Sequence, residues 1–246
     1  MPKYSVIFDH DGTLMNNGLD EGRAVSPILA SHGIAITPEQ FAVRFASISS
    51  RKAYATLAHE AGIDLLVGFD KLAEQAILAR AQRQGRGIAM PGMHALLSTL
   101  AESGTTLAVA SGSSLFWLKT MLGQTEFDHF FQERVCSADE VREGKPAPDL
   151  LLYTAEKIGV PPEQCIYIGD GTPDIVASKA AGMKAIGLLA GDHCAFNPNL
   201  YSLMRQEGAD HIAKSVGDLA AAIHHFQTPR YRPDLPRLSR ITPQQT

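Results

Sequence analysis

The chain has 246 residues, 45% hydrophobic and 20% charged, which is enough apolar material for a large core. Its net charge of −4 argues against a general nucleic-acid-binding protein, and no apolar run approaches the roughly 20 residues of a membrane-spanning helix. No secretory signal pattern is present, and the three cysteines lie far apart without a metal-binding motif. These features predict a cytoplasmic protein with reduced thiols.

Short apolar runs recur along the chain and predict six buried strands, at 4–8, 105–110, 134–138, 165–170, 184–189 and 210–214. The runs are apolar throughout rather than alternating, as strands covered on both faces are. Helical patterns at 93–104, 115–123, 148–159 and 173–182 alternate with them, and several end near a glycine. This alternation predicts an α/β fold with a doubly wound parallel sheet.

The segment from about 16 to 88 contains helical patterns and no strand candidate. A crossover between parallel strands needs only about a dozen residues, so this length predicts a small all-helical cap domain inserted after the first strand. Polar or glycine-rich joints at 15–20 and 85–92 are suited to act as hinges. We expect a core domain over 1–15 and 89–227, a cap over 16–88, and a disordered or extended tail over 228–246.

The first strand runs directly into two carboxylates, Asp9 and Asp11. Aspartate and glycine are ordinary turn residues, so this stretch alone fits a turn as well as a site. The ends of the later strands decide between the two, because ligands bind at the carboxyl ends of strands in an open α/β sheet. Polar residues recur at those ends: Ser111 and Gly112 after the second strand, Lys145 after the third, and Asp170 and Asp174 after the fourth.

These residue types suit phosphoryl transfer. Clustered carboxylates repel one another unless a cation joins them, and oxygen ligands favour Mg²⁺ over zinc. One carboxylate can attack phosphorus and form an aspartyl phosphate, provided that a cation and a lysine offset the charge repulsion. The second carboxylate, Asp11, can protonate the leaving oxygen and then activate water. The paired acids are therefore expected to be nucleophile and general acid/base.

Four motifs in this order resemble those of the haloacid dehalogenase superfamily of aspartate-nucleophile phosphatases: DHDGTL at 9–14, Ser111, Lys145 within KPAPD, and GDGTPD at 169–174. The resemblance covers about residues 1–226, and the helical insert resembles the cap of the subgroup that includes phosphoglycolate phosphatase. It implies that Asp9 is the nucleophile and Asp11 the acid/base.

The resemblance also implies a ligand set for Mg²⁺ and for the substrate. Mg²⁺ is expected to bind the Asp9 carboxylate, the Asp11 backbone carbonyl and Asp170. Asp174 is expected to contact the cation through a water molecule or to hold the ligating groups in place. Phosphate and substrate contacts are expected from Gly12, Thr13, Ser111, Gly112, Lys145 and, in the cap, Arg51.

Some positions depart from the commonest pattern of this family. His10 stands where many relatives have an apolar residue and is expected to be structural, and Met15-Asn16-Asn17 replaces the usual Val-Asp-Ser. In the cap, Arg51 or Arg44 is a candidate for contacting an anionic group of the substrate. An ion pair within the cap explains these arginines equally well.

The sequence therefore predicts a Mg²⁺-dependent phosphatase for a small phosphomonoester, of the phosphoglycolate or sugar phosphate class, acting as a monomer or homodimer. It predicts neither nucleic acid nor membrane as a partner. One alternative is a phosphosugar mutase of the β-phosphoglucomutase type, although such relatives often have Glu-Asp where this chain has Gly169-Asp170. The other is a non-catalytic protein of the same fold that binds a phosphorylated ligand and releases no phosphate.

Overall fold

All six predicted strands are present in the computed structural model, which describes residues 4–45, 50–64 and 68–228. They are β1 (Ser5–Phe8), β2 (Leu107–Ser111), β3 (Val135–Ser137), β4 (Cys165–Gly169), β5 (Lys184–Leu188) and β6 (His211–Ala213). Every neighbouring pair is parallel, and the order is β3-β2-β1-β4-β5-β6. The chain thus runs outward from β1 in one direction and then in the other, which confirms the doubly wound sheet and places a switch point at β1 and β4.

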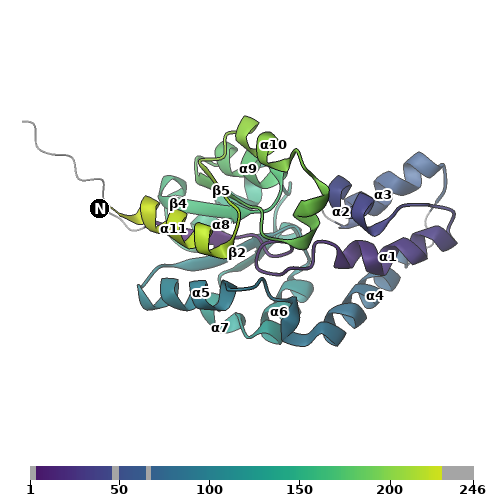
Figure 1. Ribbon diagram of the computed structural model, residues 1–246, viewed down its shortest axis with the longest axis horizontal. Helices are drawn as coiled ribbons and strands as arrows, with labels where there is room; N and C mark the ends of the chain where they lie inside the picture. Colours follow the sequence, from purple (N-terminus) through teal and green to yellow (C-terminus); the bar gives the residue numbers. More distant parts are fainter. Residues whose placement is uncertain (1–3, 46–49, 65–67, 229–246) are drawn as a thin grey trace, which may run out of the picture.

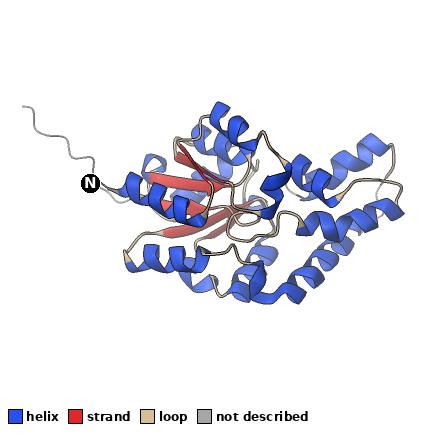
Figure 2. Ribbon diagram, in the orientation of Figure 1, coloured by secondary structure: helices blue, strands red, loops and turns tan. Residues whose placement is uncertain are grey.

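Helices cover both faces of this sheet (Figure 2). One face carries α5 (Met93–Glu102), α6 (Leu115–Thr125), α7 (Asp128–Phe131) and α11 (Val216–Gln227), and the other carries α8 (Asp149–Lys157), α9 (Thr172–Ala180) and α10 (Leu200–Gln206). Successive strand residues point to opposite faces, so Val6 and Phe8 pack into one apolar cluster and Ile7 into the other. The apolar run from Val6 to Phe8 in β1 therefore follows from the burial of this strand on both sides.

Four of the helices between β1 and β2 lie together at one end of the molecule (Figure 1). They are α1 (Asp20–Ser31), α2 (Pro38–Phe45), α3 (Ser50–Ala61) and α4 (Phe69–Gln84). Their apolar faces form a cluster of their own that includes Leu29, Phe41, Tyr54 and Phe69. A helical unit with its own core is what the sequence led us to expect of a cap, while the boundaries at residues 16 and 88 stay a prediction.

The two connections to these helices run side by side. The Asn16 amide donates to the Ile88 carbonyl at 2.8 Å, and the Met90 amide donates to the Leu14 carbonyl at 2.8 Å. Both joints predicted as hinges therefore meet at one place, directly after the loop that carries Asp9 and Asp11. The tail beyond residue 228 lies outside the described residues, and within them no helix has the length and apolar character needed to cross a membrane.

Candidate active site

Lys145 lies at the centre of a buried group of charges. Its Nζ is 2.9 Å from Asp9 Oδ1 and 2.6 Å from Asp174 Oδ1, and all three side chains are at most 4% exposed. Asp9 follows β1, Asp174 lies in the first turn of α9 after β4, and Lys145 precedes α8. The strand ends therefore bring these predicted residues together, as expected for the carboxyl edge of this sheet.

Local structure fixes both partners of the lysine. The Gly171 amide donates to Asp174 Oδ2 at 2.9 Å, which holds that carboxylate at the beginning of α9. Tyr167, fully buried in β4, accepts from Lys145 Nζ at 3.0 Å and donates to the Ala110 carbonyl at 2.8 Å. We did not predict Tyr167, although a tyrosine inside a buried strand signals a hydroxyl that needs hydrogen-bond partners.

The pKa values in this cluster follow from burial and from an excess of negative charge. Burial raises the pKa of Asp9 to about 8; Lys145 opposes this rise, and the charges of Asp174 and Asp170 add to it. Burial disfavours the charged lysine, yet Asp174 and Asp9 hold the pKa of Lys145 well above its ordinary value. One lysine cannot neutralise several buried carboxylates, so the cluster suits a further positive charge.

A divalent cation fits this cluster. Asp9, Asp170 and Asp174 are all buried and each offers a carboxylate oxygen, and these oxygens lie within 4.8 Å of one another. A set of oxygen donors alone is what Mg²⁺ prefers. Both carboxylate oxygens of Asp174 already accept hydrogen bonds, one from Lys145 and one from the Gly171 amide. Asp174 therefore fits the predicted indirect role, through water or by holding the ligating groups, better than direct binding of the cation.

Asp11 has a different environment. Its carboxylate accepts hydrogen bonds from Asn17 Nδ2 at 2.5 Å, Ser113 Oγ at 2.5 Å and Trp117 Nε1 at 3.0 Å, and His10 Nδ1 lies 3.1 Å away. Burial alone would raise the pKa of Asp11, but His10, Ser113 and Asn17 lower it well below its usual range. The Asp11 carboxylate is thus held ionised beside the cluster. It is not one of the clustered carboxylates, so Asp11 would bind the cation only through its backbone carbonyl, as predicted.

The other predicted contacts lie around these carboxylates. Ser111 is buried at the end of β2, and its Oγ accepts from the Ser113 amide at 3.4 Å, with half-buried Gly112 between them. Gly12 adopts a positive φ of 78°, and its amide donates to Asn17 Oδ1 at 3.0 Å. Thr13 is fully buried. Their proposed contacts with substrate stay predictions.

His193 also reaches the cluster, and the sequence had not indicated it. It lies in the short 3₁₀ helix η4 (Asp192–Phe196) after β5, is 4% exposed, and places Nε2 2.7 Å from Asp170 Oδ2. Burial would lower the pKa of this imidazole, but the contact with Asp170 raises it to about 11. Histidine and aspartate are 23 residues apart in the sequence, with no spacing that indicates a pair.

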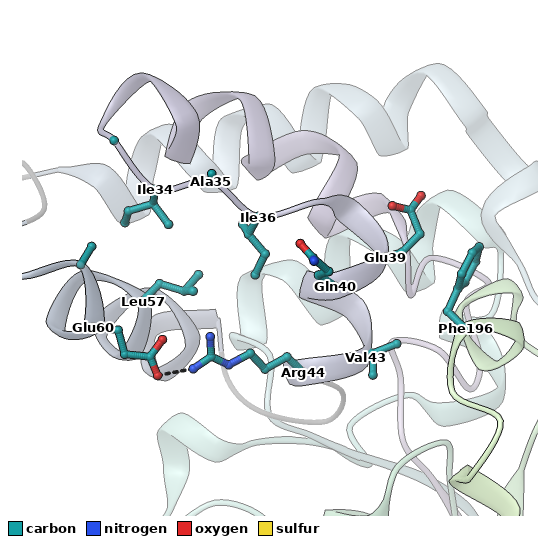
Figure 3. Close-up of a pocket in the computed structure, with 12 residues that line it drawn as sticks. Ile34, Ala35, Ile36, Glu39, Gln40, Val43, Arg44, Leu57, Glu60 and Phe196 are labelled. Carbon is teal, nitrogen blue, oxygen red and sulfur yellow. Dashed lines mark hydrogen bonds and ion pairs between the residues drawn. The ribbon is translucent and has the colours of Figure 1, made fainter.

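The two cap arginines pair within the cap. Arg44 contacts Glu60, and Figure 3 shows this pair beside a cavity of about 720 Å³ that Val43 and Phe196 also line. Arg51 is 85% exposed, with Nε 3.8 Å from Asp70 Oδ2. Neither this cavity nor a second one beside Arg51 is lined by a residue of the acidic cluster. The structure thus does not bring either arginine to Asp9, and an Arg51 contact with substrate stays a prediction.

The fold and this cluster together define an α/β enzyme of the doubly wound type, with buried carboxylates and a lysine at the carboxyl edge of its sheet. Residues 6–188 match the family model of haloacid dehalogenase-like hydrolases, and this chain belongs to that family. The phosphoglycolate phosphatase of Pseudomonas putida is 30% identical over 190 residues, which are 76% of this chain and 69% of that protein. The phosphoglycolate phosphatase of Xanthomonas campestris is 31% identical over 195 residues, 76% of this chain and 83% of the relative.

A solved structure adds to these relatives. The haloacid dehalogenase family hydrolase of Deinococcus radiodurans, crystallised with bound phosphate and sodium, is 26% identical and superposes with a TM-score of 0.71 over 91% of this chain and 96% of that one. The expected family and fold are confirmed, and the relatives support the assignment of this enzyme as a phosphatase.

Proposed function

We propose that this protein is a Mg²⁺-dependent phosphatase that hydrolyses a small phosphomonoester of the phosphoglycolate or sugar phosphate class through an aspartyl phosphate on Asp9. The observation that carries the proposal is the buried arrangement of Asp9, Lys145 and Asp170 at the carboxyl edge of the sheet. The phosphatase names of the two bacterial relatives and the phosphate bound to the Deinococcus hydrolase support it. A cytoplasmic location and a monomeric or homodimeric state are part of the same proposal.

In the first step, an Asp9 carboxylate oxygen bonds to phosphorus while the bond from phosphorus to the leaving oxygen breaks. The protonated form of Asp11, which is the minor form near neutral pH, supplies the proton that the leaving oxygen takes up. In the second step, water attacks phosphorus, Asp11 accepts the proton of that water, and the bond between phosphorus and Asp9 breaks to release phosphate. Lys145, fixed by Asp174 and Tyr167, holds positive charge where the phosphoryl oxygens gather.

Asp9 and Asp170 would hold the cation, with Asp174 behind them and the Asp11 carbonyl as a further candidate ligand. Bound there, Mg²⁺ would offset the repulsion between the attacking carboxylate and the phosphate dianion. Burial raises the pKa of Asp9 to about 8, which supports a role for this added charge, because a protonated Asp9 is no nucleophile.

The test is phosphate release from a panel of small phosphomonoesters, including phosphoglycolate and several sugar phosphates, with Mg²⁺ or with EDTA. Wild type, Asp9→Asn and the exposed control Asp64→Asn are compared. We expect Mg²⁺-dependent turnover that is lost in Asp9→Asn and kept in Asp64→Asn. Folded wild type that releases no phosphate from any panel member would refute the proposal. Sugar phosphate isomerisation that requires a bisphosphate would then indicate the mutase.

A further inference from the structure

His193 occupies a site built around its imidazole ring. A Cβ on Gly18 would collide with Nδ1, one on Gly191 would lie 2.6 Å from Cε1, and one on Gly12 would lie 3.0 Å from Cε1. The three glycines come from the loop after β1, the joint to the cap and the loop after β5. Three separate segments thus lack side chains at the positions where this ring needs room.

The polar contacts of the ring are both made through Nε2, with Asp170 and, at 3.5 Å, with Cys194 Sγ. Nε2 lies 2.7 Å from Asp170 Oδ2, and Nδ1 is buried with no hydrogen-bond partner among the described residues. Burying an imidazole with one nitrogen unsatisfied costs free energy, so packing alone gives no reason for a histidine here. The reason that the structure offers is the carboxylate at the other nitrogen.

Both sides of the histidine are anchored. The Asp192 amide donates to Asn16 Oδ1 at 2.9 Å, and Arg23 Nη1 of α1 lies 3.7 Å from Asp192 Oδ2. At the other end of η4, Phe196 lines the cavity against α2 (Figure 3). The segment is therefore held by the loop after β1 and by the cap helices. These contacts lie outside the acidic cluster and fix the orientation of the imidazole ring.

We propose that His193 is a positioning residue that holds the Asp170 carboxylate in place for the cation. A carboxylate that is free to rotate loses conformational freedom when a metal ion binds, and a fixed hydrogen bond removes that cost in advance. Nε2 donates the same hydrogen in the charged ring and in the neutral tautomer protonated there, so this role does not depend on the titration of the ring. The proposal rests on the proposed function only in taking Asp170 as a cation ligand.

The test measures cation affinity directly. Mn²⁺ is titrated into the metal-free protein and free Mn²⁺ is followed by electron paramagnetic resonance, for wild type, His193→Gln and His193→Asn. The glutamine amide reaches about as far as Nε2, whereas the asparagine amide is one methylene shorter. We expect His193→Asn to bind Mn²⁺ about 10–100-fold more weakly than wild type, and His193→Gln to bind within about threefold of it.

His211→Asn is the matched control, because His211 is half-buried and contacts Asp218 at 3.2 Å, outside the acidic cluster. Its Mn²⁺ affinity should equal that of wild type. A folded His193→Asn protein that binds Mn²⁺ as tightly as wild type would overturn the proposal, and so would equal losses in the asparagine and glutamine variants.

Wild type supplies a second measurement that holds even if the asparagine variant fails to fold. Ring ¹⁵N resonances of His193 should show a proton on Nε2 before and after Mg²⁺ is added, and loss of that proton on binding would overturn the proposal. The two proposals also fail separately. Mn²⁺ binding that depends on His193 without any phosphate release refutes only the phosphatase, while turnover with unchanged affinity in His193→Asn refutes only the role of His193.

Discussion

Ser113 and Asp11 are joined by a hydrogen bond from Oγ to Oδ2 of 2.5 Å that connects the ends of β1 and β2 across 102 residues. This bond is one of the contacts that hold the pKa of Asp11 below its usual range. A general acid with so low a pKa carries little proton at neutral pH, which limits the step in which it protonates the leaving oxygen. The hydrogen bonds that hold the Asp11 carboxylate in place therefore also limit its ability to donate a proton.

Ser113→Ala should raise the pKa of Asp11 by roughly one unit, since a hydrogen bond to a charged group contributes about 1.5–3 kcal/mol and one pKa unit corresponds to about 1.36 kcal/mol. The alkaline limb of the kcat/KM profile should then move to higher pH by a similar amount. Ser202→Ala, at an exposed position of α10, serves as the control. Superimposable profiles for the two variants and wild type would show that this bond does not tune the acid.

Tyr167 is expected to contribute to both stability and turnover. Tyr167→Phe removes the acceptor of Lys145 and the donor to the Ala110 carbonyl, both buried. Leaving buried polar groups unsatisfied costs about 1–3 kcal/mol, so the free energy of unfolding should fall by that amount in urea titrations. Turnover should fall about tenfold, because the lysine loses one of the contacts that orient it.

Tyr153→Phe is the matched control for this substitution. The Tyr153 hydroxyl donates to Glu140 Oε1 at 3.0 Å in an exposed pair, so its loss should change the free energy of unfolding by less than about 0.5 kcal/mol. Equal effects of the two substitutions would mean that the buried hydroxyl of Tyr167 supports Lys145 no more than a surface contact would.

The raised pKa of Asp9 predicts how the stability of the metal-free protein depends on pH. Asp9 titrates near 8 in the folded state and near 4 when unfolded, so its contribution to stability is complete below pH 4 and is lost as the pH rises toward 8. The free energy of unfolding should fall by at most about 1.4 kcal/mol per pH unit in this window. The raised pKa of His193 also lowers the free energy of unfolding as the pH rises, but only above the ordinary histidine pKa of about 6.5. Measurements between pH 5 and 6.5 therefore report mainly on Asp9.

Mg²⁺ should stabilise the protein most at the pH values where its binding displaces a proton from Asp9 at the least cost in free energy. Thermal unfolding with Mg²⁺ and with EDTA at pH 5 and 6.5 should show a larger stabilisation by the cation at the higher pH, since binding displaces a proton from the site. In Asp9→Asn the pH dependence of the metal-free protein should flatten. A stabilisation by Mg²⁺ that does not change with pH would contradict the shifted pKa of Asp9.

Much of the architecture could be predicted because each buried strand is encoded locally. The apolar run of β4, for example, ends at Gly169 and is followed at once by Asp170, so the strand and the residue at its end are adjacent in the sequence. Lys145 could be found for a similar reason, since KPAPD is a short local motif. The order of these motifs along a parallel sheet then places them at one edge.

The residues that were missed depend on distant segments. The contact of His193 with Asp170 requires η4 to fold back over Gly12 and Gly18, and no local pattern shows that approach. The donors of Asp11 come likewise from the segments after β1 and after β2 and from α6. The cap arginines had two interpretations from the sequence, a substrate contact or an ion pair within the cap, and the structure pairs Arg44 with Glu60.

Glu21 on α1 is predicted to select among substrates. Its Oε1 accepts from the Tyr54 hydroxyl at 2.8 Å. Burial raises the pKa of Glu21, hydrogen bonds from Ser50 and Tyr54 oppose the rise, and the charge of Asp11 adds to it, so Glu21 lies within electrostatic range of the acid/base. If a second anionic group of the substrate is bound roughly 8 Å away, an ionised Glu21 would repel it by about 2 kcal/mol at an effective dielectric constant near 20. The hydroxyl-rich sugar phosphates should therefore be better substrates than phosphoglycolate.

Glu21→Gln removes this charge while keeping an acceptor for Tyr54. We expect the ratio of kcat/KM for phosphoglycolate to that for a sugar phosphate to rise at least about tenfold, because only phosphoglycolate carries the repelled carboxylate. Glu74→Gln, at an exposed position of α4, controls for the change in net charge and should leave the ratio as it is in wild type. If the ratio is the same in all three proteins, Glu21 does not face the bound substrate, and the choice between the two substrate classes must come from other side chains of the cap.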